Sequence, residues 1–155
     1  MSWLRPGVEI TYDDKLTLIR NFLAELVRGE KVYLISPHWQ LTDDLRGMIA
    51  DALKRGIELR CLMGEGEELI PEDQSFIEDE QLNMRSLHQL HAKLYWSPRH
   101  TLLTSINLLD YSGRKTGEIA IMVQDKAYLK ELETLADTWW EKSNQPCGAR
   151  QTQST

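Results

Sequence analysis

Two short β-rich segments, at residues 90–96 and 101–107, decide the fold of this chain. The first reads Leu90-His91-Ala92-Lys93-Leu94-Tyr95-Trp96, and the second reads Thr101-Leu102-Leu103-Thr104-Ser105-Ile106-Asn107. Side chains two residues apart on a strand point to the same face of a sheet. We therefore expect His91, Lys93 and Tyr95 on one face of the first strand. The opposite face carries Leu94 and Trp96 and is apolar enough to be core.

Polar side chains also alternate on the second segment, where Ser105 and Asn107 share a face. A turn at residues 97–100 predicts a hairpin that lays the two strands side by side. Glu118 then opens a third apolar run, at 119–123, where an ionised carboxylate is costly unless it has a partner. The ring N–H of a histidine is such a partner. We expect an imidazole, an ammonium, a hydroxyl, an amide and a carboxylate to meet at one site.

Upstream of these segments, a strand at 32–35, a helix from Thr42 to Gly56 and a strand at 57–62 form one βαβ unit. Such a unit predicts a parallel pair with a right-handed crossover. Apolar periodicity elsewhere predicts further elements: a helix at 13–28, capped by Asp13 or Asp14 and stopped at Gly29, a helix at about 125–142, and strands at 83–87, 90–96, 101–106 and 118–123. The chain is therefore expected to be α/β, with a mixed, mostly parallel central sheet flanked by helices on both faces.

Length and composition bound the domain organisation. With 155 residues, of which 41% are hydrophobic and 27% charged, the chain has the makeup of one globular domain and not of a wholly disordered protein. We expect this domain at 1–143 and a disordered polar tail at 144–155. No apolar run reaches the roughly 20 residues of a membrane-spanning helix. The first residues contain no apolar core of a signal peptide, so none is expected.

Cysteine usage and charge indicate the compartment and the partners. Cys61 lies in an expected buried strand and Cys147 in the tail, so we expect reduced thiols and a cytoplasmic location. Acidic residues outnumber basic ones by 24 to 18, which argues against a globally basic nucleic-acid binder. Residues 84–116, however, hold five basic residues against Asp110 alone. Residues 64–80 contain eight acidic residues and no basic one, and are expected to form a solvated loop with a short helix.

Together these motifs resemble the phospholipase D superfamily. Its signature is His-x-Lys, four intervening residues, Asp, then Gly-Ser-x-Asn, then a Glu that opens a later strand. The residues that match this signature are His91, Lys93, Ser105, Asn107 and Glu118. The upstream strand–helix–strand and the closing Trp139-Trp140 pair also fit, so the resemblance extends over about residues 12–142.

Two positions depart from that signature. Pro98 stands where the family has the Asp, and Thr104 stands where it has the Gly before the serine. In the family this Asp supports the structure without touching phosphorus, so the reacting groups are still present. A proline at this position indicates that the hairpin closes in a different way.

The resemblance implies a phosphodiesterase that needs no metal and no cofactor. His91 is then the nucleophile, and Glu118 fixes its tautomer. Lys93 and Asn107 hold the non-bridging oxygens of the phosphate, and Ser105 adds a hydrogen bond. The leaving oxygen needs a proton from a second acid, which related enzymes take from a second His-x-Lys motif. This chain has one such motif, so we expect a homodimer that brings two His91 side chains to one phosphate.

Three functions are compatible with this resemblance. The first is a nuclease that cleaves DNA or RNA through a phosphohistidine, with Arg114, Lys115 and His38 contacting the substrate. The second is a cardiolipin-type phospholipid phosphodiesterase, although the acidic segment disfavours a stable membrane association. The third is a binding or scaffold protein that keeps the fold without turnover. A metal site at His88 and His91 is not expected, because a strand places residues three apart on opposite faces.

Overall fold

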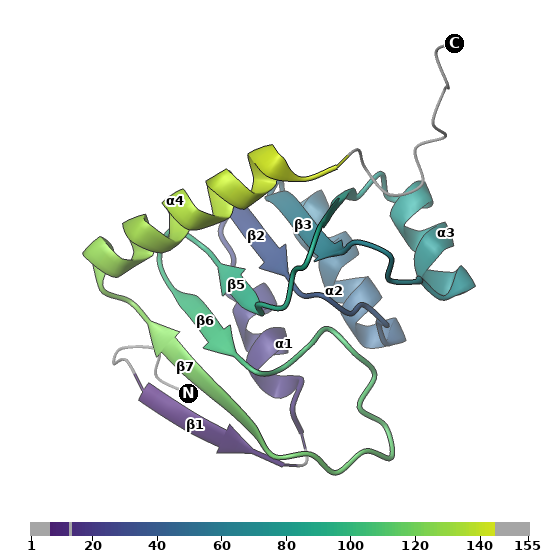
Figure 1. Ribbon diagram of the computed structural model, residues 1–155, viewed down its shortest axis with the longest axis horizontal. Coiled ribbons are helices and arrows are strands. Elements are labelled where there is room, and N and C mark those ends of the chain that lie inside the picture. The colour runs from purple at the N-terminus through teal and green to yellow at the C-terminus, as the bar shows by residue number, and fades with distance from the viewer. Residues whose placement is uncertain (1–6, 13, 145–155) are drawn as a thin grey trace.

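The computed structural model describes residues 7–12 and 14–144 and shows a seven-stranded sheet packed between helices (Figure 1). The expected α/β class is confirmed. The predicted tail lies outside the described residues from position 145 onward. The elements in chain order are β1 (Gly7–Thr11), α1 (Thr17–Ala24), β2 (Lys31–Ile35), α2 (Asp43–Lys54), β3 (Glu58–Gly64), α3 (Pro71–Asp79), β4 (Asn83–Leu87), β5 (Leu94–Trp96), β6 (Thr101–Thr104), β7 (Glu118–Val123) and α4 (Lys126–Lys142).

The sheet is mixed, but it is mostly antiparallel and not mostly parallel as expected. Its strands lie in the order β1-β7-β6-β5-β2-β3-β4. Only the β2–β3 and β3–β4 pairs are parallel, and the other four neighbouring pairs are antiparallel. Parallel strands need a long crossover, which α2 and α3 supply, whereas a tight turn such as the one between β5 and β6 allows only antiparallel pairing. The edge strand β1 was not predicted from the sequence.

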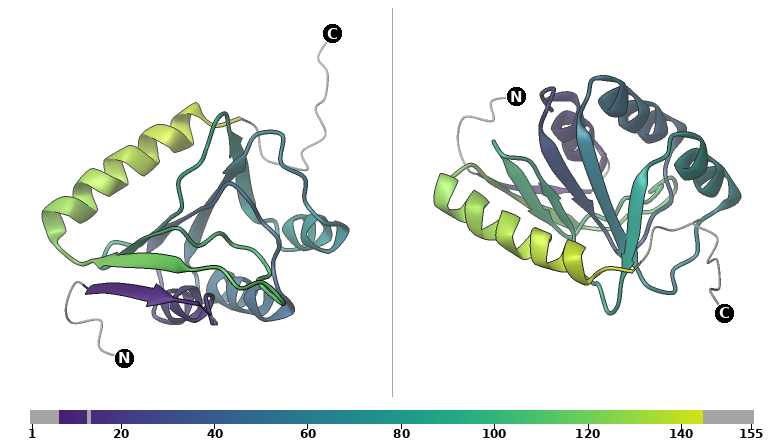
Figure 2. Two further views of the ribbon diagram at one scale, coloured as in Figure 1. Left: turned by 60° about the horizontal axis from the view of Figure 1, so that its bottom comes forward. Right: turned by 90° about the horizontal axis from the view of Figure 1, so that it is seen from above.

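Helices cover both faces of the sheet, as predicted (Figure 2). α1 and α2 lie on one face, where Phe22 and Ile49 belong to the larger of two apolar cores. α4 lies on the other face, where Trp140 packs with Trp96 and Leu129 in a smaller core. None of the helices in the described part of the chain has the length and apolar character that a membrane crossing needs.

The βαβ unit forms where the sequence predicted it. Thr42 is the N-cap of α2, and its hydroxyl accepts the backbone N–H of Leu45 at 3.2 Å. Gly56 follows α2 with a φ of +83°, a backbone conformation that a side chain would strain. Cys61 on β3 is a fully buried free thiol, and burial raises its pKa.

The first helix is shorter than the predicted 13–28. α1 begins after Leu16, which occupies the N-cap position without a side-chain hydrogen bond. Asp14 lies two residues earlier, and hydrogen bonds to Thr17, the first residue of the helix, lower the pKa of its carboxyl group. Asp13 lies outside the described residues. Gly29 has a φ of +86° in the turn before β2, after the helix has already ended.

Both strands that carry the motif residues are also shorter than predicted. β5 begins only at Leu94, and β6 ends at Thr104. His91 and Lys93 therefore precede a strand, where strict alternation of faces no longer applies. Tyr95, which was expected beside them, is fully buried in the core under α1 and α2, and its hydroxyl donates to a backbone carbonyl 2.7 Å away.

The hairpin between β5 and β6 closes on Ser97. The buried hydroxyl oxygen of Ser97 accepts the backbone N–H groups of Arg99, at 3.4 Å, and of His100, at 3.2 Å. Pro98 is exposed at the tip of this turn. A serine thus satisfies the backbone donors of the turn, next to the position where the resembled signature has its Asp.

One acidic residue of the 64–80 segment is buried, contrary to the expectation of a solvated segment. Asp73 on α3 is 1% exposed, and its carboxylate accepts hydrogen bonds from the Arg46 guanidinium at 2.7 Å and from the backbone N–H of Leu41 at 2.9 Å. These bonds tie α3 to α2. The other seven acidic residues of the segment are exposed, as predicted.

We expect Asp73→Ala to lower the free energy of unfolding by about 2 kcal/mol, because it leaves the buried backbone N–H of Leu41 without its acceptor and removes one of the two carboxylates that pair with Arg46. Urea titration at neutral pH measures this change. Glu72→Ala removes the exposed neighbouring carboxylate of the same helical turn, and this control should change the free energy by less than about 0.5 kcal/mol. Equal effects of the two substitutions would contradict the role given to Asp73.

Stability should also depend on the protonation of His100. This ring is 2% exposed and packs edge-on against Phe22, with ring centres 5.2 Å apart. Burial, with a smaller contribution from the charge of Arg99, lowers the pKa of His100 to about 4. An unfolded histidine titrates near pH 6.5. Between these values the unfolded state binds more protons, so stability falls as the pH drops.

The free energy of unfolding should therefore fall further between pH 7 and pH 4.5 in the wild type than in His100→Gln, by about 2 kcal/mol. Urea titrations at both pH values measure the difference. His88→Gln, at an exposed histidine, serves as the control and should behave as the wild type. A wild-type pH response in His100→Gln would show that this ring does not cause it.

Candidate active site

Four chain segments that carry polar residues meet at one edge of the sheet. β5 pairs in antiparallel fashion with both β2 and β6, so that Leu94 lies opposite Ile35 on one side and Leu103 on the other. The chain that leaves β2 and the chain that leaves β6 therefore lie beside the chain that enters β5. β6 also pairs in antiparallel fashion with β7, which begins at the same edge. We call this set the polar edge: residues 36–38, 91–93, 105–107 and 118.

Ser105 and Glu118 are bonded to each other at the polar edge. The Ser105 hydroxyl donates to one carboxylate oxygen of Glu118, and the Thr116 hydroxyl donates to the other at 3.0 Å. The Ser105 oxygen also accepts the backbone N–H of Ile119 at 3.0 Å. These hydroxyls satisfy the half-buried carboxylate at the start of β7. No hydrogen bond joins Glu118 to His91 among the residues that the structure describes.

Asn107 is held in place by the end of β2. The buried Ser36 hydroxyl lies 3.3 Å from the side-chain oxygen of Asn107 and 2.8 Å from the backbone carbonyl oxygen of His38. The backbone N–H of Asn107 donates to the Tyr111 hydroxyl at 2.8 Å. Since the Asn107 oxygen is turned toward Ser36, its NH₂ group is the end of the amide that can donate to an anion.

His91 and Lys93 lie in the segment that enters β5. His91 is exposed and Lys93 is half-buried, and neither side chain makes a hydrogen bond or an ion pair within residues 7–12 and 14–144. The backbone places Lys93 beside the end of β6, because its carbonyl oxygen accepts the N–H of Thr104 at 3.4 Å. An unpaired imidazole and an unpaired ammonium, on a segment next to the one that carries Asn107, are groups suited to bind an anion.

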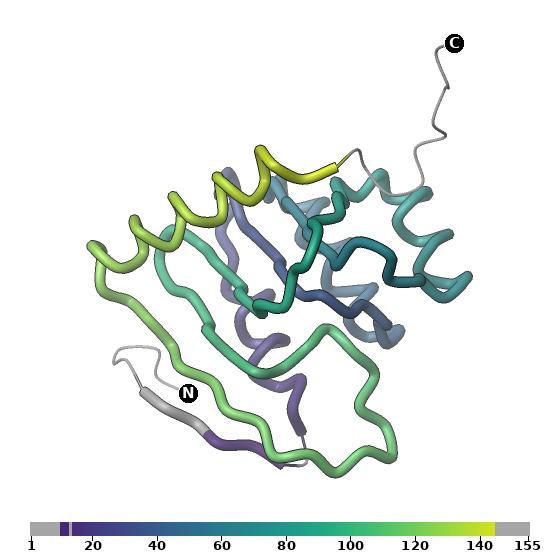
Figure 3. Tube along the Cα trace, viewed as in Figure 1, coloured from purple at the N-terminus to yellow at the C-terminus, as the bar shows by residue number. Residues whose placement is uncertain are grey.

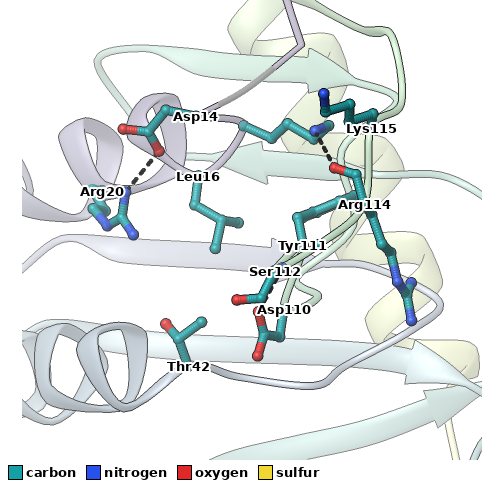
Figure 4. A pocket seen from close by; sticks show the side chains of 11 residues that line it. Asp14, Leu16, Arg20, Thr42, Asp110, Tyr111, Ser112, Arg114 and Lys115 are labelled. Atoms are coloured by element: carbon teal, nitrogen blue, oxygen red, sulfur yellow. Dashed lines mark hydrogen bonds and ion pairs between the residues drawn. The ribbon is translucent and has the colours of Figure 1, made fainter.

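The predicted substrate-contacting residues line two cavities next to the polar edge. His38 and Arg114 line one of about 330 Å³, where the Nδ1 atom of His38 lies 2.9 Å from a carboxylate oxygen of Glu67. Arg114 and Lys115 line the other, of about 350 Å³, beside the start of α1 (Figure 4). Both basic residues belong to the connection between β6 and β7, which Figure 3 traces as a long excursion away from the sheet.

Two of the five basic residues in the 84–116 segment lie elsewhere. Arg99 pairs with Glu30 at 3.1 Å in the turn at the opposite end of β5 from the polar edge. The guanidinium of Arg85 stacks on Trp140, with 4.2 Å between its central carbon and the ring centre. The positive balance that the sequence suggested for the site is therefore reduced to Lys93, Arg114 and Lys115.

Sequence reasoning missed three residues that hold the predicted ones in position: Ser36, Tyr111 and Thr116. Ser36 carried a signal, because it directly follows a strand and precedes Pro37. Tyr111 and Thr116 lie in an irregular connection without periodicity, so the sequence held no sign of their contacts. Burial raises the pKa of Tyr111, which keeps its hydroxyl protonated beside Asn107.

His88 and His91 are both exposed, and the Nδ1 atom of His88 lies 3.7 Å from a carboxylate oxygen of Glu65. Within the described chain, no group of three or more His, Cys, Asp or Glu side chains is placed to hold a metal ion.

No protein-family model and no curated protein matches this chain. Solved structures do match it. The phospholipase D family member Nuc from Salmonella typhimurium is similar with a TM-score of 0.75 and 13% sequence identity, over 90% of this chain and 97% of that one. The phosphatidylserine synthase of Haemophilus influenzae is similar with a TM-score of 0.69 and 15% identity, over 91% of this chain and 40% of that one.

A third match is TrmBL2, an archaeal chromatin protein whose structure shows a novel mode of DNA binding. Its TM-score is 0.64, with 13% identity over 89% of this chain and 54% of that one. Identities this low describe the fold alone. The chain therefore shares the fold of the phospholipase D family member Nuc.

Proposed function

We propose that this chain is a metal-independent phosphodiesterase that cleaves nucleic acid as a homodimer. The observation that carries the proposal is the strand pairing that sets the segment of His91 and Lys93 between the chain leaving β2 and the chain leaving β6, which carries Asn107. The likeness to a phospholipase D family member of which the chain spans 97% supports phosphodiester chemistry. The likeness to a DNA-binding chromatin protein supports a nucleic-acid substrate.

His91 supplies the nucleophile in this proposal. A ring nitrogen of the neutral imidazole attacks phosphorus, so that a nitrogen–phosphorus bond forms while the bond from phosphorus to the leaving oxygen breaks. The leaving oxygen takes a proton from a second imidazole in its protonated form. Water then gives a proton to that same imidazole and displaces His91 from phosphorus, which restores both rings.

The other side chains of the polar edge bind or position. Lys93 and the NH₂ group of Asn107 donate to the non-bridging oxygens, where charge builds up in the transition state. The Ser105 hydroxyl already donates to Glu118, so we assign this pair to positioning: it holds the end of β6 against the start of β7. Asn107 follows Ser105 by two residues and is fixed by this contact together with Ser36.

The second imidazole comes from a second copy of the chain, since one chain carries a single His-x-Lys motif. An apolar patch on the α4 side of the sheet supports this assembly. In it Ile10 lies opposite Ile119, and Leu103 lies opposite Ile121. All four side chains are exposed, from 36% for Leu103 to 66% for Ile10. Contiguous exposed apolar side chains mark interaction surfaces.

The patch adjoins the polar edge along the chain. Leu103 precedes Ser105 by two residues, and Ile119 directly follows Glu118. A second copy that covers the patch about a twofold axis therefore brings its own polar edge near the first. Each His91 can then attack or protonate at a shared phosphate.

We expect the purified protein to cleave labelled single- or double-stranded DNA or RNA in the presence of EDTA. His91→Ala should slow this cleavage by about a thousandfold or more, because it removes both the nucleophile and the proton donor. Lys126→Ala, at an exposed lysine on the first turn of α4, is the control and should leave the rate unchanged. Cleavage that requires added magnesium would contradict the mechanism.

The same assay, extended to cardiolipin vesicles, separates the two alternatives. Hydrolysis of the lipid without cleavage of nucleic acid would establish the lipid phosphodiesterase, which the likeness to a phosphatidylserine synthase favours. Binding of DNA without turnover of any substrate would establish a scaffold protein, for which Pro98 at the Asp position is the supporting feature.

The apolar patch gives a separate prediction for the assembly. Ile121→Asp should weaken self-association by at least about a hundredfold, because it places a charge in the proposed interface. Sedimentation equilibrium should then report the mass of one chain, 18.0 kDa, and nuclease activity should fall as the dimer dissociates. Val27→Asp, at an exposed apolar residue before β2, is the control. A fully active monomer would rule out the shared site.

A further inference from the structure

The cavity of about 350 Å³ beside α1 has a composition that the proposed chemistry does not use. It lies between the chain around the start of α1, the N-cap of α2 and the 110–115 part of the β6–β7 connection (Figure 4). Four basic residues line it, against two acidic ones: Lys15, Arg20, Arg114 and Lys115, against Asp14 and Asp110.

The acidic residues are already engaged. Asp14 pairs with Arg20 at 3.0 Å, as Figure 4 shows, and Arg20 also bonds to Asp44 outside the cavity. Asp110 accepts the backbone N–H of Ser112 at 2.8 Å, and hydrogen bonds to Ser112, with a smaller contribution from the charge of Arg114, lower its pKa. By contrast, Arg114 and Lys115 form no ion pair with any described residue.

Lys15 adds a buried charge to the wall of this cavity. The side chain is 1% exposed, and its ammonium donates to the backbone carbonyl oxygens of Tyr12 and, at 3.2 Å, of Arg114. It also lies 5.4 Å from the centre of the Tyr111 ring. Within the described residues no carboxylate forms an ion pair with it. Among the described residues the partners of this buried ammonium are neutral, and an anion in the cavity would supply a counter-charge.

Tyr111 joins the cavity to the polar edge. Its side chain lines the cavity, while its hydroxyl accepts the backbone N–H of Asn107 at 2.8 Å. Tyr111 therefore lies between the cavity and Asn107, the residue that we propose to bind the reacting phosphate. A nucleic-acid strand carries a phosphate at every nucleotide, so a phosphate held at Asn107 brings the next one close to the cavity.

We infer that this cavity is a second phosphate subsite, which holds the phosphate of a nucleic-acid strand next to the one at the polar edge. Arg114 and Lys115 bind this phosphate, and the buried ammonium of Lys15 adds positive charge to the wall of the cavity. The inference rests on the proposed function and sharpens it, since the preferred substrate is a strand with at least two consecutive phosphates.

Binding of two dinucleotides tests the subsite apart from the chemistry. Thymidine dinucleotide with and without a 5′-phosphate is titrated into full-length His91→Ala protein, which does not turn the probe over. The added phosphate should lower Kd by about tenfold, and Lys115→Gln combined with Arg114→Gln should reduce this gain to about twofold or less. Lys126→Gln, which removes one exposed charge on α4, should keep the full gain.

The salt dependence of Kd gives a second measurement, which would not change if Arg114 and Lys115 had only a structural role. With a longer single strand, the slope of log Kd against log salt should fall by about 0.7 for each phosphate that the double variant no longer neutralises, as expected for counterion release from single strands. An unchanged slope in the double variant would overturn the inference.

The outcomes separate this inference from the proposed function. A phosphate gain that survives in the double variant overturns the subsite, whether or not the wild type cleaves nucleic acid. If the 5′-phosphate no longer lowers Kd in the double variant, the subsite is supported even when the wild type cleaves no nucleic acid. In that case only the proposed nuclease activity is contradicted. If the double variant binds cardiolipin vesicles more weakly, and the dinucleotide phosphate brings no gain in the first place, the cavity would be assigned to a lipid headgroup.

Discussion

The antiparallel pairing of β5 with β2 on one side and β6 on the other is the constraint on which the candidate site depends. β5 spans only Leu94–Trp96 and is buried throughout. Because both neighbours run against it, the chain entering β5 lies between the chains leaving β2 and β6. This places the segment of His91 and Lys93 between the segments that carry Ser36 and Asn107. Parallel pairing would have put them at opposite ends of the sheet.

The distribution of ion pairs decides where this acidic chain keeps unpaired positive charge. The net charge is −6, and seven basic residues in the described body of the fold pair with a carboxylate: Arg20, Lys31, Arg46, Arg55, Arg60, Arg99 and Lys130. Near the polar edge the described part of the chain leaves Lys93, Arg114 and Lys115 without one. Local potential at a site, and not net charge alone, governs the attraction of a charged ligand. The seven exposed acids of the 64–80 segment add to the overall charge without pairing with these three residues.

The parts of the fold that could be predicted are those whose signals are local. Thr42 and Gly56 were predicted to mark the two ends of a helix, and in the structure Thr42 is the N-cap of α2 and Gly56 follows its last turn with a left-handed backbone. The apolar periodicity of residues 125–142 likewise predicted α4. β1 carried no such signal, because it is a strand only where the edge of β7 accepts it. The balance of parallel and antiparallel pairs depended on which strands became neighbours, which no single segment encodes.

The sequence by itself indicated the residue types of the candidate site, because a His-x-Lys just before one strand and a Ser-x-Asn just after the next can be recognised by their spacing. Tertiary structure alone decided their contacts. It ended β6 before Ser105, turned Glu118 toward Ser105 and Thr116, and separated Arg99 from the other basic residues. The contact between Ser36 and Asn107 spans 71 positions. Sequence periodicity predicts which side of a helix or strand is apolar. It does not predict a hydrogen-bond partner this distant along the chain, because that contact forms only when the whole sheet packs.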